Sequence, residues 1–398
     1  MAHLILALVP IWCGAHLLLA EPPGQNFFTH PDVHPFEIQL SPKSLAGLRA
    51  MPREYVTGTV RVDGVTYTNV GIHLKGVATF RPVDDQPSLT LNFGKFVDKQ
   101  RFHGLRKIHL NNGKEDPTFL CEAISAEMFA AAGLPVARVT HARTRLNGRD
   151  LGPYVAIEGF TAEFLARYFH NTRGNLYDSG FTRDVTQPLE RLSGKAPDDW
   201  ADLKALAAAA RAPDLDQRWQ QLVRVLDTNN FSRYLAMQVL TANWDGYALY
   251  KNNYRIYHDP ESDRLFFIPH GMDQMFTPSH ILMPLMPPHW VGLVARAFME
   301  TPQGRALYEQ QIGLLYTNVY HAEALARRVD ELAARVRPIL AERNEVAGQQ
   351  YEQEAEELRE RIKLRGHLIR QQLATTNWMN PTVPGRPGYR PLRTLRDL

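Results

Sequence analysis

The hydrophobic pattern changes once along this 398-residue chain, from a two-residue period to a helical period. Up to about residue 160, apolar and polar residues alternate in short runs, which is the pattern of strands with one buried face. Beyond that point, apolar residues recur every three or four positions, as in helices. We therefore expect an α+β fold, with a β-rich N-terminal lobe over residues 35–160 and a mainly helical C-terminal lobe over residues 161–378. A chain of this length is too large for one small core and fits two lobes.

Two turn signals separate the strands of the first lobe. Asp63-Gly64 lies between alternating runs at 55–62 and 65–67, and Asn147-Gly148 follows the run at 143–146. Such pairs are typical of hairpin turns. Further strands are expected at residues 37–40, 70–75, 89–93, 107–110 and 154–158.

Helices are predicted from caps and from periodicity. Asp116-Pro117 predicts a helix start that Gly133 ends, because Asp caps helices and Pro suits the first turn. In the second lobe a single hairpin interrupts the helices, with strands at 254–258 and 264–269. We expect the charged run at 352–365 to be a solvated helix face. The helices of the second lobe are expected at 161–168, 197–212, 215–226, 230–241 and within 304–374.

The two ends of the chain differ from the rest in composition. Residues 1–20 are apolar from Leu4 to Leu19 apart from His16, and Ala20 precedes Glu21, as in a secretory signal peptide. We therefore expect a secreted or periplasmic (cell-envelope) protein with no transmembrane span in its mature chain. Residues 379–398 are rich in Pro and read as a flexible tail.

Charge and cysteine content exclude several classes of protein. The formal net charge is +3, and no basic stripe of the kind that binds nucleic acid is present. The mature chain keeps Cys121 alone, so it has no internal disulfide and no cysteine-based metal site. We expect a monomer with a protein substrate.

The densest group of chemically useful residues surrounds the hairpin of the second lobe. Asp245 precedes it, Asn252 and Asn253 lie before its first strand, and Asp273 follows its second strand. Antiparallel pairing brings the two outer ends of a hairpin together. Phosphoryl transfer needs a carboxylate at the attacking hydroxyl, and an amide oxygen with a second carboxylate to hold magnesium. Two alternatives stay open: the two Asn are turn residues, or the two Asp are the acid and base of a metal-dependent hydrolase.

Several short segments together resemble one family. They are Arg101-Phe102-His103-Gly104-Leu105-Arg106-Lys107 with Leu110-Asn111-Asn112, Asp116-Pro117-Thr118-Phe119-Leu120 with Glu122, Gly152-Pro153-Tyr154 with Glu158, Gly174-Asn175-Leu176-Tyr177, Asn243-Trp244-Asp245 with Asn252-Asn253-Tyr254, and Phe267-Ile268-Pro269 with Asp273. In order and spacing they are similar to the CotH kinase family of spore coat protein H and its relatives, over residues 35–378.

The resemblance implies an atypical protein-kinase-like fold and the use of ATP with Mg²⁺ or Mn²⁺. It implies that secreted or surface proteins are phosphorylated, commonly on Ser. By position, Asp245 resembles the catalytic Asp and Asp273 the metal-binding Asp. Asn253 resembles the metal-binding Asn, with Asn252 as the reserve.

The chain departs from the family on the phosphate side of the first lobe. The strand at 89–93 carries Thr90 and Asn92 where members tend to carry Lys, so Lys75 or Lys95 is expected to supply that charge. If neither does, the alternative is a catalytically degenerate binding protein for surface or coat assembly.

Three further residues of the first lobe are expected near the nucleotide. Glu122 is a candidate to orient the lysine, or else a favourable charge near a helix start. Asn111 is a candidate to line the nucleotide site. Glu158 is a candidate contact to the base or sugar, because its strand ends where a kinase joins its lobes.

Overall fold

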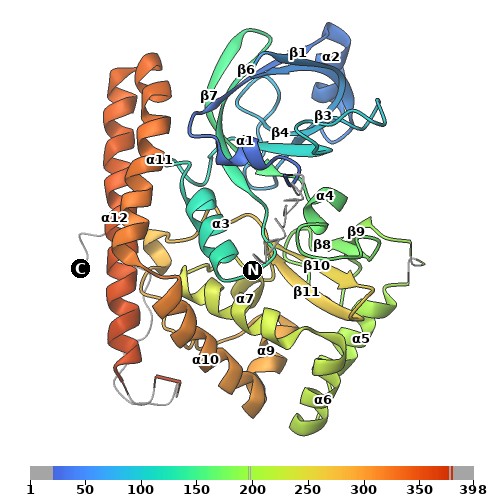
Figure 1. Cartoon of the computed structure of the whole chain (residues 1–398), viewed down its shortest axis with the longest axis vertical. Helices are drawn as coiled ribbons and strands as arrows, with labels where there is room; N and C mark the ends of the chain where they lie inside the picture. Colours follow the sequence, from blue (N-terminus) through green and yellow to red (C-terminus); the bar gives the residue numbers. More distant parts are fainter. Residues whose placement is uncertain (1–20, 196, 198, 376–377, 380–398) are drawn as a thin grey trace, which may run out of the picture.

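The strands of the first lobe close into a barrel, shown at the top of Figure 1. The computed structural model describes residues 21–195, 197, 199–375 and 378–379, so the predicted signal peptide and nearly all of the predicted tail lie outside the described residues. A parallel pairing of the first strand with the sixth completes the barrel. Around the barrel the order is β1 (His34–Leu40), β2 (Val56–Val62), β3 (Val65–Lys75), β4 (Ser88–Asn92), β5 (Lys107–Asn111), β7 (Arg149–Glu158) and β6 (Val139–Leu146).

Both predicted hairpin turns of the first lobe are confirmed. Val62 pairs with Val65 across Asp63-Gly64, and Leu146 pairs with Arg149 across Asn147-Gly148. Alternate residues of each strand fill the barrel, and Phe36, Ile72 and Leu91 are fully buried. Two short helices, α1 (Gln25–Thr29) and α2 (Pro42–Ala50), belong to this lobe and were not predicted.

One helix, α3 (Cys121–Ala131), lies between the barrel and the helical body (Figure 1). The predicted start, with Asp116 as cap and Pro117 as first helical residue, is wrong by four residues, because residues 116–119 form turns before the helix begins. The Asp116 carboxylate still caps it, accepting the Cys121 N–H at 2.8 Å and the Thr118 N–H at 3.0 Å. This cap fixes the first turn of α3, which carries Glu122.

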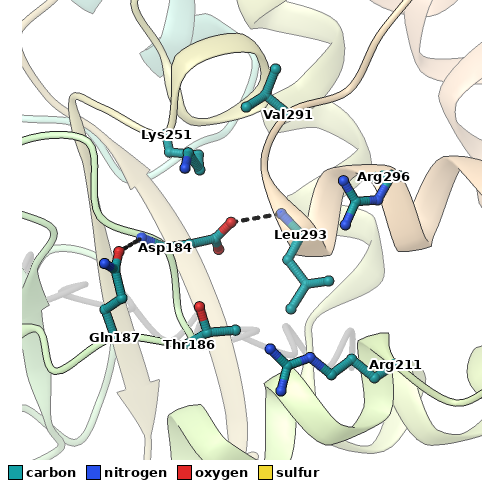
Figure 2. A pocket seen from close by; sticks show the side chains of 8 residues that line it. All are labelled: Asp184, Thr186, Gln187, Arg211, Lys251, Val291, Leu293 and Arg296. Atoms are coloured by element: carbon teal, nitrogen blue, oxygen red, sulfur yellow. Dashed lines mark hydrogen bonds between the residues drawn. The ribbon is translucent and has the colours of Figure 1, made fainter.

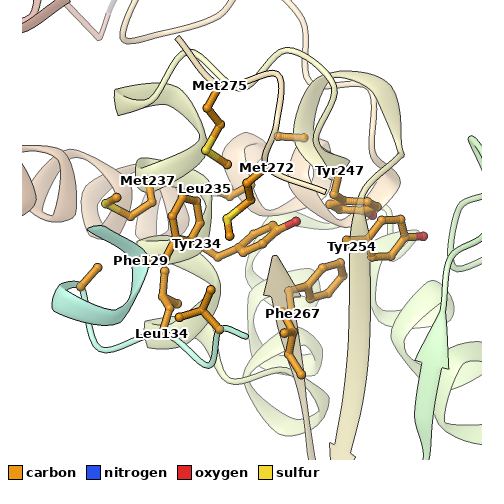
Figure 3. Packing of buried hydrophobic residues seen from close by; sticks show 14 of the residues in the cluster. Phe129, Leu134, Tyr234, Leu235, Met237, Tyr247, Tyr254, Phe267, Met272 and Met275 are labelled. Atoms are coloured by element: carbon orange, nitrogen blue, oxygen red, sulfur yellow. The ribbon is translucent and has the colours of Figure 1, made fainter. Parts of the chain in front are cut away.

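The hairpin of the second lobe is confirmed, but it belongs to a larger sheet. Strands β10 (Tyr254–Asp259) and β11 (Arg264–Pro269) pair antiparallel. Two short strands that the sequence analysis missed, β8 (Leu176–Asp178) and β9 (Glu190–Ser193), extend the sheet in the order β11-β10-β8-β9. The hairpin packs on helix α7 (Thr228–Leu240) through aromatic rings, such as Tyr234 against Phe267 at 5.8 Å between centroids (Figure 3).

Helices make up the rest of the second lobe. A long pair, α11 (Ala322–Arg343) and α12 (Glu345–Leu373), flanks both the body and the barrel (Figure 1). The prediction that residues 352–365 form a solvated face is wrong in part. Arg365 is fully buried, and its guanidinium donates to the carbonyls of Leu240 and Ile281, which anchors the long helix to the body. The remaining elements are α4 (Ala162–Leu165), α5 (Ala201–Ala210), α6 (Leu215–Val225), α8 (Tyr247–Tyr250), the 3₁₀ turn η1 (Pro278–His280), α9 (Leu293–Glu300) and α10 (Pro302–Asn318).

Candidate functional site

The outer ends of the β10–β11 hairpin bring Asn253 close to the segment that carries Asp273. Tyr254 pairs with Pro269, and the His270 N–H donates to the Asn253 carbonyl at 3.2 Å. Gly271 has a φ of +58°, and a Cβ there would lie 2.6 Å from Asn253 Oδ1. Glycine at 271 therefore lets the Asn253 amide oxygen approach the chain two residues before Asp273.

Asp245 lies in the turn between α7 and α8 and is held by both asparagines. Asn253 Nδ2 donates to Asp245 Oδ2 at 2.6 Å, and Asn252 Nδ2 lies 3.2 Å from each oxygen. The residue is 8% exposed. Burial raises the pKa of the Asp245 carboxyl, and the two amide donors oppose that rise. Because the amide nitrogen of Asn253 faces Asp245, its oxygen is left on the side of Gly271.

Two more acidic groups meet next to the hairpin. Glu122, from α3, is 3% exposed and accepts the Met272 N–H at 3.1 Å. The Met272 side chain is buried in the core beside Tyr234 and Leu235, which fixes the backbone next to Asp273 (Figure 3). Burial raises the pKa of Glu122, and the charge of Asp273 raises it further. Burial likewise raises the pKa of Asp273, followed by the charge of Asp116. Burial and neighbouring carboxylates thus both disfavour the charged forms of these two groups.

Lys75 reaches the same region from the barrel. Its Nζ donates to Asn111 Oδ1 at 2.5 Å, so the ends of β3 and β5 hold the ammonium in place. Burial lowers the pKa of Lys75, while the neighbouring charges of Glu122 and Asp273 oppose that fall. The structure therefore brings together Lys75, Asn111, Glu122 and Asp273, four residues that the sequence analysis singled out.

A second group of charged residues adjoins Lys75 and was missed by the sequence analysis. Arg255, on β10, pairs with Asp178 at 2.6 Å, and its guanidinium lies 3.9 Å above the Phe160 ring centroid. Burial opposes ionisation of Asp178, but Arg255 nevertheless holds the pKa of that carboxyl at about 2. Arg255 Nε and Nη1 are buried and have no hydrogen-bond partner within the described part of the chain. Lys107 is close by, and burial followed by the charge of Arg255 lowers its pKa.

Proximity in the sequence could have revealed Arg255. It stands two residues after Asn253, the expected metal ligand, in a strand that the sequence analysis predicted. Lys107 ends one of the segments that resemble the family, but the sequence analysis assigned it no role. Both residues add positive charge beside Lys75.

A sequence comparison decides the family. The family described as "CotH kinase protein" matches residues 72–369. The chain belongs to the CotH kinase family. The sequence-based resemblance is confirmed, and with it the description of the chain as a kinase-like protein.

Curated relatives of this CotH kinase family member come from a fungus and a bacterium. "Invasin CotH2" of Rhizopus delemar is 24% identical over 254 residues, which are 58% of this chain and 42% of the relative. "Inner spore coat protein H" of Bacillus subtilis is 25% identical over 192 residues, which are 45% of this chain and 52% of the relative. The chain thus spans about half the length of these relatives.

Two solved structures are distantly similar. The Helicobacter pylori proinflammatory kinase CtkA has a TM-score of 0.34 at 9% identity, over 71% of this chain and 94% of that one. The toxin–antitoxin protein HipA of Shewanella oneidensis, in its complex with HipB and operator DNA, has a TM-score of 0.29 at 14% identity, over 71% of this chain and 60% of that one.

Two of the candidate nucleotide contacts of this CotH family member lie in other surroundings. Lys95 is exposed, and its ammonium lies 4.9 Å from the Tyr55 ring centroid. Glu158 has no exposed surface, and its two oxygens are paired with Arg138 at 2.7 Å and Arg167 at 2.8 Å. Both acceptor atoms of Glu158 are therefore committed within the protein.

Membrane and metal features were also sought in the described residues. None of the helices there is both long and apolar enough to cross a membrane. The same residues include no group of three or more His, Cys, Asp and Glu arranged to hold a metal. The expected ligand pair, the Asp273 carboxylate and the Asn253 amide oxygen, is smaller than such a group. A pair of this kind leaves the other ligand positions of an ion to phosphate oxygens and water.

Proposed function

We propose that this chain is an exported protein kinase that transfers the γ-phosphoryl group of ATP to a Ser or Thr hydroxyl of a secreted or surface protein. The observation that carries the proposal is that Asn253, at the start of the hairpin, donates to Asp245 and lies against Gly271, two residues before Asp273. Lys75 of the barrel is close enough to Asp273 for the carboxylate to influence its pKa. These parts come from distant positions in the sequence, and phosphoryl transfer requires each of them.

Asp245 is the proposed contact for the acceptor hydroxyl. Its raised pKa makes it a better proton acceptor than an exposed Asp, and Asn252 and Asn253 fix its orientation. In the transfer the hydroxyl oxygen bonds to the γ-phosphorus, its proton passes to Asp245, and the bond to the β-phosphate oxygen breaks to release ADP. Asn252 is assigned this anchoring role, because its amide is directed at Asp245.

Asp273 and the Asn253 amide oxygen fit a divalent ion. Both are hard oxygen donors, which Mg²⁺ and Mn²⁺ prefer. Burial raises the pKa of Asp273 and of Glu122, and a nearby cation would favour their charged forms. When bound, such an ion neutralises charge on the nucleotide phosphates.

Lys75 is the proposed phosphate contact of the barrel. Asn111 positions its ammonium, and Glu122 is close enough to influence its pKa. Lys107 and Arg255 add positive charge at the same place, which favours a polyanion such as a triphosphate. Lys95 and Glu158 receive no role in the nucleotide site.

Export and a surface substrate rest on two observations. Residues 1–20 have the composition of a signal peptide, and the curated relatives are named as a spore coat protein and as invasins. We propose a monomer that acts on proteins outside the cytoplasm.

The test is phosphate transfer by the purified protein. With γ-labelled ATP, Mg²⁺ or Mn²⁺ and a casein-like acceptor, we expect labelling of the acceptor. Asp245→Asn and Asp273→Ala should each reduce it at least a hundredfold. The matched control is Asp263→Asn, in the exposed hairpin turn at a φ of +55° that Asn tolerates, and it should label normally.

Labelling that persists in Asp273→Ala would remove the site assignment. A folded parent protein that labels no acceptor with either metal would instead favour the degenerate binding protein.

A further inference from the structure

A cavity of about 530 Å³ on the helical body is lined by three basic residues (Figure 2). Arg211 follows α5, Lys251 caps the C-terminal end of α8, and Arg296 lies on α9. Figure 2 shows the three side chains around one open space, although they come from three separate elements. Their positions in the sequence do not indicate that they meet.

None of these three side chains has an ion-pair partner among the residues that the structure describes. The acidic residue of the cavity, Asp184, is 8% exposed and committed to other contacts. It accepts the Leu293 N–H at 2.9 Å and the Tyr247 hydroxyl at 3.1 Å. Asp184 therefore braces the wall of the cavity, and the three cations remain available to an anion.

Neutral donors complete the lining. The Gln187 side-chain oxygen accepts the Asp184 N–H at 2.9 Å, which leaves its amide N–H groups for other partners. Thr186 adds a hydroxyl to the same cavity (Figure 2). Charged guanidinium groups together with N–H and O–H donors are the usual partners of carboxylate and phosphate oxygens.

The short helix α8 connects Asp245 to the cavity. It begins directly after Gly246, and Lys251 caps its C-terminal end, so four helical residues, ~6 Å of rise, separate Asp245 from Lys251 along the helix. Trp244, next to Asp245, contacts Tyr250, next to Lys251, with 5.6 Å between ring centroids. An extended peptide advances about 3.3 Å per residue, so an acceptor at Asp245 would present to the cavity a side chain about two or more residues away.

We propose that this cavity, defined by Arg211, Lys251 and Arg296, binds an anionic side chain of the acceptor protein, either a carboxylate or a phosphorylated residue. The proposal rests on the proposed kinase function, because it places the acceptor hydroxyl at Asp245. It makes the preferred acceptor a Ser or Thr with an acidic or phosphorylated neighbour.

The first experiment measures kcat/KM on synthetic peptides with a single Ser acceptor. Each carries Glu, phosphoserine or Gln at one position, two to four residues on either side of the acceptor. The parent should prefer an anionic peptide about tenfold over its Gln counterpart. Arg211→Gln with Arg296→Gln should abolish this preference and leave the Gln peptide and the KM for ATP unchanged. Comparing kcat/KM on the Glu and phosphoserine peptides distinguishes a carboxylate from a phosphorylated residue as the bound anion.

Two control proteins isolate the effect of the cavity. Arg224→Gln removes an exposed arginine of α6 outside the cavity and should keep the full preference. Arg211→Lys with Arg296→Lys preserves the charge and should retain most of it. Equal kcat/KM on anionic and neutral peptides in the parent, or an undiminished preference in the double Gln variant, would overturn the proposal.

A binding experiment separates this proposal from the proposed function. Fluorescence polarisation of labelled Glu and phosphoserine peptides needs no phosphate transfer. If the parent transfers no phosphate but binds the anionic peptide, and the double Gln variant binds it about tenfold more weakly, the kinase function fails and the anion site stands. If the double Gln variant binds equally well, the anion site fails whatever the activity.

Discussion

At the scale of single residues, the position of one lysine decides how the phosphates are bound. The sequence offered Lys75 and Lys95 as equivalent candidates, because both lie near the strand that lacks the family's lysine. In the structure Lys75 is held by Asn111 beside Glu122 and Asp273, whereas Lys95 is exposed beside Tyr55. A positive charge acts strongly on phosphates only where it is fixed and partly shielded from water.

We expect Lys75→Met to reduce kcat/KM for ATP at least a hundredfold, while Lys95→Met changes it less than threefold. The physical reason is that only Lys75 is fixed beside the proposed metal ligand. Lys75→Met should not lower the unfolding midpoint, because it removes an ammonium group whose burial costs free energy. Steady-state kinetics and urea unfolding of both variants check this, and equal losses of activity would contradict it.

At the scale of elements, the sequence predicted strands and turns better than helix starts. Asp63-Gly64 and Asn147-Gly148 set hairpin turns through their own backbone preferences, so local sequence is sufficient. Asp116 misled the prediction because its carboxylate caps the helix from five residues away, across a turn that no local rule describes. Strands β8 and β9 are three and four residues long. Pairing with β10 stabilises β8 and pairing with β8 stabilises β9, and such pairing is not a local property.

The same limit applies to the site. The approach of Asn253 to Asp245 and to Gly271 could be predicted, because Asn253 lies at the outer end of one hairpin. The approach of Glu122 to Met272 and the pairing of Arg255 with Asp178 join distant segments, so the sequence could not indicate them.

An ion pair between β10 and α5 provides a pH-dependent test of how the hairpin is held. His258 Nδ1 lies 3.3 Å from Asp202 Oδ2, and its Nε2 lies 2.9 Å from Asp263 Oδ1. The hydrogen bond to Asp202 raises the pKa of His258 above 6.5, although burial opposes the rise. Stabilisation by the charged imidazole is therefore complete below about pH 6.5 and is lost as the pH rises through the folded-state pKa. Asp202, with a pKa of about 2, stays ionised throughout.

We expect His258→Gln to lower the free energy of unfolding by about 1 kcal/mol at pH 6, and by less at pH 9. Denaturant unfolding at the two pH values measures the difference. His170→Gln, which removes an almost fully exposed histidine, should show no such pH dependence. A loss that is the same at both pH values would show that the His258 charge does not contribute.

At the scale of the whole molecule, the fold consists of two hydrophobic cores joined at the proposed site. One core fills the barrel, and the other extends from α3 through the helical body. The parallel pairing of β1 with β6 that closes the barrel joins segments more than a hundred residues apart, and Arg365 anchors α12 to carbonyls of α7 and the loop after β11. Neither feature follows from local periodicity, so the sequence predicted two lobes without predicting how each one closes.

The proposed nucleotide and metal contacts are divided between these two cores. Lys75 and Asn111 belong to barrel strands, whereas Asn253 and Asp273 belong to the helical body. A ligand that touches all four binds only when both cores are folded and correctly placed. Its binding free energy is then added to the stability of the folded state, by about 2.7 kcal/mol at a hundred times the dissociation constant.

We therefore expect Mg²⁺ together with a non-hydrolysable ATP analogue to raise the thermal unfolding midpoint by several degrees. Either one alone should raise it much less, because the phosphates complete the ion's ligands and the ion offsets their charge. Differential scanning fluorimetry with and without a chelator measures this, with Asp273→Ala as the variant that should lose the joint effect and Asp263→Asn as the one that should keep it. If the analogue stabilises Asp273→Ala as much as the parent in the presence of Mg²⁺, the nucleotide binds without the ion, and the hairpin carries no metal site.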